Sequence, residues 1–259
     1  MKRALFSLSP LLSRRWWWTT LLVIAGIILL AWLGFWQLDR LEQRRADNVL
    51  IEAQLSAPPL DLNTTPPTEA EHGARYREVV VTGTLDISRQ VFLVQQRYNE
   101  RLGQHLIAPL QIAGTNQAVL IDRGWIPGGD DNSPEWPDFP VSGEVVIKGF
   151  IQPTETLSGQ RDASLPSPDN PQKEWFRVDV EAIQAQVPYA LLPFYILQAP
   201  ETNNNLVIED LPYRIAPEID LSDGPHLSYA LQWFTFSLML GFGYIYFVNK
   251  ESAAGPRKH

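Results

Sequence analysis

Histidine is the side chain in this sequence best suited to hold a metal, and His226 occupies the most informative position of the four histidines. It follows Gly224 and Pro225 and opens a long apolar run, which predicts that His226 lies in the first turn of a helix. The positive end of a helix dipole disfavours a protonated ring, so we expect the unprotonated nitrogen that a metal ligand needs. This position suits an axial ligand to heme iron.

Helical spacing places both ring surface and small side chains on or beside the face below His226, at Tyr229, Ala230, Trp233 and Ser237. A flat hydrophobic macrocycle could lie against such a face. The alternative is that His226, Tyr229 and Trp233 form an interfacial belt that only sets the depth of the helix in a membrane. Spacing alone leaves both interpretations open.

Motifs for other kinds of chemistry are absent from the sequence. It has no cysteine, which excludes disulfides, thiolate catalysis and thiolate ligands for copper. It has no HExxH, no GxSxG, no phosphate-binding GxxxxGK loop and no GxGxxG after a strand. We interpret His105 as a packed or surface residue of a strand and His72 as a loop residue without a nearby partner. These absences favour a protein that is not an enzyme.

Two apolar segments must position His226. Residues 16–38 form an uncharged stretch of 23 residues that reaches ~34 Å as a helix, enough to cross a bilayer. Residues 227–248 form a second uncharged stretch, with Tyr244 and Tyr246 near its end where rings can sit among lipid headgroups. Bulky residues and then Asp39 follow the first stretch where a cleavage site would need small ones, so we expect a retained anchor.

Charge predicts the orientation of these segments. The two tails carry a net charge of +6, whereas residues 39–225 contain 14 basic and 28 acidic residues, a net charge of −14. Basic flanks usually stay cytoplasmic, although Arg40, Arg44 and Arg45 count weakly against this assignment. A mitochondrial presequence fits less well than a bacterial inner membrane, because only 15 residues precede the first span. The acidic domain also makes nucleic acid a poor partner.

The sequence therefore predicts an α+β membrane protein in which two transmembrane helices flank one β-rich domain. We expect a cytoplasmic N-terminus at 1–15, transmembrane helices at 16–38 and 226–248, a periplasmic domain at 39–225, and a cytoplasmic tail at 249–259.

Within the domain, five short β-branched runs predict an antiparallel sheet or small barrel: REVVVTGTL, QVFLVQQR, HLIAPLQI, QAVLIDRG and EVVIKGFI. The first span should continue as a polar helix to about Leu55, and Asp179 should cap a short helix. FYILQA and NLVIED should supply the last strands. The loops 128–140 and 158–172 are long enough to form a binding rim, as in an enzyme or a sensor.

Two polar motifs accompany these elements. Gly34, Trp36, Gln37 and Arg40 end the first span, where Gln37 could hydrogen-bond to the second helix near Gln232 or cap a ligand carboxylate. The alternative there is an aromatic anchor with a polar exit. In the second motif, Arg123-Gly124-Trp125, Gly124 should permit a bulge or turn while Trp125 packs on the sheet.

Taken in order, GFWQLDRLEQR, YREVVVTGTL, GQHLIAPL, LIDRGWIP and GPHLSYALQWFTFS resemble the surfeit locus protein 1 family of cytochrome oxidase assembly factors. The resemblance covers both spans and most of the domain. Asp122 stands where the family frequently shows Asn, and the acidic loop 128–140 is individual to this chain.

The resemblance implies a two-span inner membrane protein, without enzymatic activity, that promotes insertion of heme a into the catalytic subunit of a heme-copper oxidase. Besides that subunit and membrane lipid, a heme a synthase is an implied partner. The resemblance implicates His226 in heme binding, with Gln232 and Trp233 as its neighbours and with Gly34, Trp36, Gln37 and Arg40 in support. The competing hypothesis is a scaffold that holds an oxidase assembly intermediate and never carries heme.

Overall fold

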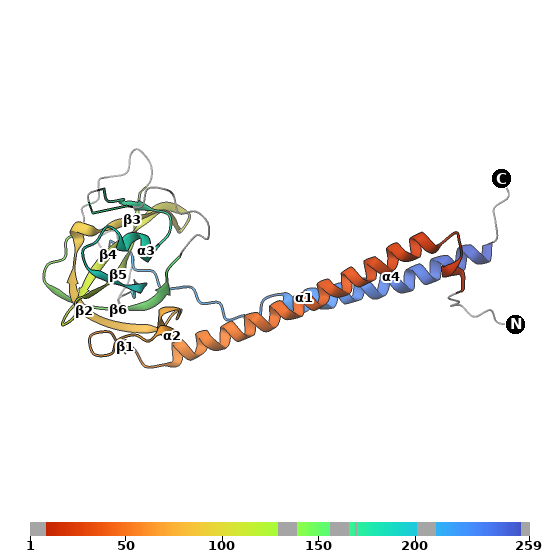
Figure 1. Ribbon diagram of the computed structural model, residues 1–259, viewed down its shortest axis with the longest axis horizontal. Coiled ribbons are helices and arrows are strands. Elements are labelled where there is room, and N and C mark those ends of the chain that lie inside the picture. Colours follow the sequence, from red (N-terminus) through yellow and green to blue (C-terminus); the bar gives the residue numbers. More distant parts are fainter. Residues whose placement is uncertain (1–8, 129–138, 156–165, 169, 201–210, 255–259) are drawn as a thin grey trace. The chain divides into compact units, whose positions relative to one another are not determined.

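The computed structural model describes residues 9–128, 139–155, 166–168, 170–200 and 211–254. The chain divides into two compact units. The helical unit consists of residues 1–49 and 220–259, and the barrel unit consists of residues 50–219. Figure 1 labels the two long helices of the first and most of the strands of the second. The predicted α+β architecture, two apolar helices flanking a β-rich domain, is confirmed.

Two long helices, α1 (Trp17–Ser56) and α4 (His226–Ala254), dominate the helical unit, with the 3-10 turn η1 (Ser9–Leu12) before α1. Both are long and apolar enough to cross a membrane, with mean hydropathies of 2.3 and 1.3 in their most apolar stretches. Only 6% and 11% of those stretches is buried, unlike the core helix of a soluble domain. The expected helical extension to about Leu55 is confirmed, because α1 ends at Ser56.

The two long helices pack against each other in antiparallel directions through small residues (Figure 1). A Cβ atom added at Gly34 would lie 2.6 Å from the ring of Phe234, so only a glycine permits this approach. Further along, the Ser237 hydroxyl donates a hydrogen bond to the backbone oxygen of Ile27 at 3.2 Å. Small residues at a helix–helix contact allow the close backbone approach on which membrane helices depend for association.

Five strands of the barrel unit form a closed ring in the order β2–β6–β8–β5–β4, and β4 pairs back with β2. They are β2 (Glu78–Leu85), β4 (Arg101–Ile112), β5 (Gln117–Pro127), β6 (Glu144–Pro153) and β8 (Ala190–Gln198). The expected small barrel is confirmed with one difference, because β5 and β8 run parallel. A closed ring with an odd number of strands cannot alternate direction throughout, so one neighbouring pair must be parallel.

Further elements lie outside the ring of five strands: β1 (Leu60–Asp61), α2 (Glu69–His72), η2 (Ile87–Arg89), β3 (Val91–Tyr98), β7 (Glu174–Trp175) and α3 (Val180–Gln184). Asp179 caps α3 by accepting a hydrogen bond from the Ala182 amide, as predicted. The interpretation of His72 was wrong. It ends α2 rather than lying in a loop, and its ring lies 6.1 Å from that of Phe194.

Two hydrophobic clusters explain why the strand sequences are apolar on both faces. Val119 and Ile121 of β5 belong to the first cluster, together with Phe194 of β8. Leu120, between them, belongs to the second cluster with Ile183 of α3. Successive strand residues point to opposite faces, so β5 is buried on both sides and reads as a continuous hydrophobic run. The predicted strand NLVIED and most of the two predicted loops (129–138, 158–165 and 169) lie outside the described residues.

We predict that Gly34→Ala lowers the free energy of unfolding by about 1–3 kcal/mol, because the added Cβ overpacks the contact with Phe234. Gly243→Ala is the matched control, since no heavy atom lies within 4 Å of the Cβ position there. Thermal unfolding of both variants in detergent measures the effect. Equal stability of the two variants would contradict the packing described for α1 and α4.

Candidate functional site

The first residue of α4 and the end of the apolar stretch of α1 meet through one side-chain hydrogen bond. Nδ1 of His226 lies 2.9 Å from Oε1 of Gln37. His226 begins α4 as the sequence predicted. The predicted hydrogen bond of Gln37 to the second helix is confirmed, but its partner is His226 rather than a residue near Gln232, which is exposed.

This contact determines which ring nitrogen of His226 is available to a ligand. Oε1 of Gln37 faces Nδ1. An amide oxygen can only accept a hydrogen bond, so in this arrangement Nδ1 carries the proton and donates it to Gln37. In a neutral imidazole the other nitrogen, Nε2, then keeps its lone pair. A hydrogen bond from the second nitrogen is also the usual way in which proteins orient a histidine that binds a metal.

The surroundings of His226 differ on its two sides along α4. Ala230 and Ser237 are buried against α1, with exposed fractions of 1% and 8%. A flat ligand therefore cannot lie over these two residues while the helices stay paired. Tyr229, in contrast, is 47% exposed, and Trp233 is half-buried with its ring 6.1 Å from that of Phe236. These aromatic residues leave one flank beside His226 open to a flat apolar molecule.

The other first-span residues of the sequence prediction have separate roles in the helical unit. Gly34 provides the close approach to Phe234 described above. Trp36 is 46% exposed on the apolar stretch of α1. Arg40 is exposed and donates a hydrogen bond to Gln43 at 2.8 Å. The structure thus joins Gln37 to His226 and assigns the neighbouring motif residues to packing and surface positions.

Arg123, Gly124 and Trp125 belong to the barrel, where a bulge in β5 sets their positions. His105 pairs with Trp125 and Ile107 pairs with Asp122, so β5 holds one more residue than β4 over this interval. Gly124 adopts a φ of 125°, and a Cβ there would lie 2.5 Å from the Tyr213 backbone oxygen. The predicted bulge at Gly124 is confirmed.

The side chains of the barrel motif are buried and bonded within the barrel. Trp125 is 1% exposed, and its ring stacks on Tyr213 at a centroid distance of 6.1 Å. The Arg123 guanidinium donates hydrogen bonds to Oε1 of Gln90 and the backbone oxygen of Phe139. These contacts support the interpretation of the motif as structural.

The sequence interpretation also missed a histidine–aspartate pair in the barrel, in which Asp122 is buried and His105 is partly buried. Nδ1 of His105 lies 2.8 Å from the Asp122 carboxylate, and the same carboxylate accepts a hydrogen bond from the Gly124 amide. Asp122 therefore joins β4 to the bulge of β5. Only the pairing of the strands reveals this contact, since 17 residues separate the two side chains in the chain.

The model of the SURF1 family matches residues 24–238, which is most of the chain. The chain belongs to the SURF1 family. The matched range contains Gln37, the complete barrel unit and His226.

Several relatives carry the same name and align over most of their length. A SURF1-like protein of Rickettsia prowazekii (strain Madrid E) is 26% identical over 232 residues, covering 88% of this chain and 89% of the relative. One from Monosiga brevicollis is 26% identical, covering 79% and 78%. An uncharacterized SURF1-like protein of Mycobacterium tuberculosis (strain ATCC 25618 / H37Rv) is 25% identical, covering 86% and 79%. SURF1 membership therefore applies to the whole two-unit arrangement.

Sequence reasoning on this SURF1 chain missed the polar residues of α1 beyond the apolar stretch. Arg44, Arg45 and Asn48 contact the segment that leads into α4. A signal for Asn48 existed, because Gly34, Leu41 and Asn48 recur every seven residues and are the buried residues of α1. A buried asparagine in such a stripe needs hydrogen-bond partners. The segment that immediately precedes His226 was a place to look for them.

We predict that Gln37→Leu abolishes the preference for a proton on Nδ1 of His226, because the oxygen that accepts the hydrogen bond from Nδ1 is removed. Nitrogen NMR of ¹⁵N-histidine-labelled protein distinguishes the two tautomers, and His226→Ala assigns the signal. Gln232→Leu removes an exposed amide six residues further along α4 and should leave the tautomer unchanged. A wild-type protein with the proton mainly on Nε2 would contradict the assignment.

Proposed function

We propose that this SURF1 protein is an assembly factor for a heme-copper oxidase that binds heme a through Nε2 of His226 and promotes its insertion into the catalytic subunit. The carrying observation is the hydrogen bond between Gln37 and His226, which leaves Nε2 with its lone pair. Family membership over residues 24–238 supports the assignment to oxidase assembly. In this proposal the protein performs no catalysis of its own.

The residues of the helical unit fit heme better than a bare metal ion. Among the described residues, no group of three or more histidine, cysteine, aspartate or glutamate side chains could hold a metal ion. A bare ion needs several protein ligands, whereas heme iron already has four nitrogens and accepts a single axial histidine. The open flank at Tyr229 and Trp233 offers ring surface to an apolar macrocycle.

Each residue has a separate task in this proposal. His226 supplies one neutral nitrogen, and Gln37 holds the ring in one tautomer and one orientation. Tyr229 and Trp233 contact the macrocycle, with Gln232 at its edge. Delivery would exchange Nε2 of His226 for a ligand of the oxidase subunit. Heme a synthase would be the source of the cargo, and membrane lipid surrounds both helices.

We predict that His226→Ala purifies with less than a tenth of the heme found with the wild type from a host that makes heme a. His72→Ala, a histidine of the barrel unit, is the control and should retain its heme. The absorbance spectrum of the purified proteins measures heme content. Unchanged heme in His226→Ala would rule out the ligand role.

The same preparations test the scaffold hypothesis. If the protein is a scaffold, the wild type should co-purify with the catalytic subunit of the oxidase and should itself carry no heme. His226→Ala should co-purify equally well. That result would leave the family assignment intact and remove heme from the function.

We further propose that the barrel unit lies in the periplasm and both termini lie in the cytoplasm of a bacterial inner membrane. The chain has no cysteine, so single cysteines report on one site each. We predict that Phe176→Cys, 65% exposed in the barrel unit, reacts with an impermeant maleimide in intact spheroplasts. Ser252→Cys, exposed near the end of α4, should react only after lysis. The reverse pattern would contradict this orientation.

A further inference from the structure

The segment that leads into α4, residues 220–225, is held against α1 by hydrogen bonds, and we name it the strap. Asn48 makes the most buried of these contacts, with an exposed fraction of 6%. Its Nδ2 donates to the backbone oxygen of Leu221 at 2.7 Å and to that of Ser222 at 3.3 Å. Both acceptors are backbone atoms, so Asn48 fixes the path of the chain whatever side chains the strap carries.

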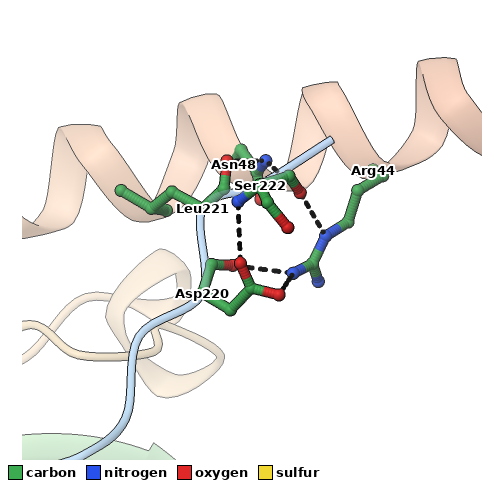
Figure 2. A network of polar contacts seen from close by, with 5 residues as sticks. All are labelled: Arg44, Asn48, Asp220, Leu221 and Ser222. Carbon is green, nitrogen blue, oxygen red and sulfur yellow. Dashed lines mark hydrogen bonds and ion pairs between the residues drawn. The ribbon is translucent and has the colours of Figure 1, made fainter. Parts of the chain in front are cut away.

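Two arginines hold the strap on either side of this contact. Arg44 donates from Nη2 to the backbone oxygen of Asp220 at 2.7 Å and from Nε to that of Ser222 at 3.2 Å, as Figure 2 shows. Arg45 pairs with the Asp223 carboxylate at 2.7 Å, and this pairing holds the pKa of the Asp223 carboxyl below its usual value. Arg44, Arg45 and Asn48 are called the clamp below.

The strap determines where the first turn of α4 begins. The first amides of a helix have no partners inside the helix, so this turn frays most easily. In α4, the backbone oxygen of Pro225 accepts hydrogen bonds from the Ser228 hydroxyl at 2.7 Å and the Tyr229 amide at 3.1 Å. His226 lies in this turn. Its ring orientation therefore depends on where the strap holds Pro225.

The short distance along the chain makes the dependence strong. Four residues lead from Ser222 to His226, and fully extended they span at most ~14 Å. Asn48 and Gln37 are eleven residues apart on α1, which is a rise of ~16 Å. The side chains of Asn48, Gln37 and His226 span the difference between these two lengths. A slip of α4 by one helical turn away from the clamp would move His226 by ~5.4 Å and would lengthen the distance that this short strap must span.

The strap also lies beside the nitrogen that the proposed function requires. Gly224 adopts a φ of 66°, and a Cβ there would lie 3.6 Å from Nε2 of His226. The backbone of the strap therefore lies close to Nε2, and a glycine at this position places no side chain there. Holding the strap fixes both the ring and the space in front of its free nitrogen.

We propose that Asn48, Arg44 and Arg45 are positioning residues, which fix the ring of His226 against Gln37 by clamping the strap to α1. The purpose of this positioning rests on the proposed function, in which Nε2 binds heme. The rest of the helix pair has its own contacts, at Gly34 with Phe234 and between the hydroxyls of Tyr244 and Thr20 at 2.7 Å. Loss of the clamp should therefore disturb His226 while the helices remain paired.

The test compares Asn48→Leu with Asp47→Leu. The first keeps the side-chain volume at a buried position and removes both donated hydrogen bonds. The second adds the same side chain at the adjacent exposed position of α1. We expect the heme-free Asn48→Leu protein to show both His226 tautomers by ¹⁵N NMR and to bind hemin about three- to tenfold more weakly, as expected for lost hydrogen bonds. Asp47→Leu should match the wild type in both measurements.

Exchanging the charges of the ion pair between Arg45 and Asp223 is an independent test, which can be made even if Asn48→Leu does not fold. Arg45→Asp and Asp223→Arg should each weaken the Nδ1 tautomer preference and hemin binding, and the double variant should restore both. Unchanged tautomer and hemin affinity in Asn48→Leu and in the two single charge variants would overturn the positioning role, although heme binding would stand. If the wild type binds no hemin, the proposed function fails, and the tautomer comparison still decides whether the clamp positions His226.

Discussion

The antiparallel contact between α1 and α4 is the interaction on which the candidate site depends. The chain places Gln37 and His226 189 residues apart, with the whole barrel between them. They meet because Gly34 allows Phe234 to pack on α1 at a distance that any side chain would prevent. Most of the surface of both apolar stretches is exposed, so packing between small residues and a few polar contacts must hold the pair.

Polar contacts occur at both ends of the helix pair, and apolar packing occupies the middle together with the hydrogen bond from Ser237 to the backbone oxygen of Ile27. At one end the Tyr244 hydroxyl lies 2.7 Å from that of Thr20. At the other end are the hydrogen bond between Gln37 and His226 and, beyond it, the clamp with its strap. Directional contacts at two separated points fix the axial register, which nondirectional packing between them could not do alone. A histidine ligand profits from this arrangement, because its lone pair has one direction.

The barrel unit is held together by different interactions from those of the helix pair. Five strands close into a ring, and the side chains of β5 are buried in two hydrophobic clusters on opposite faces. The bulge at Gly124 turns Trp125 toward Tyr213, while Asp122 links that bulge to His105. The family motif at residues 123–125 is thus explained by barrel closure and packing. The arginines of the clamp, which counted against the predicted orientation, are likewise occupied by two aspartates of the strap.

The sequence by itself determined the two apolar helices, the β-rich domain, the start of α4 at His226 and the bulge at Gly124, because each follows from local spacing, charge or backbone freedom. Only the tertiary structure decided the partner of Gln37, the parallel pairing of β5 with β8, the pairing of His105 with Asp122, and the contacts of Asn48. Each of these joins residues far apart in the chain, and local propensity carries no information about which distant groups will meet. The same holds for Ala230 and Ser237. Helical spacing placed them on the face of His226, but only the packing against α1 showed that this face is buried.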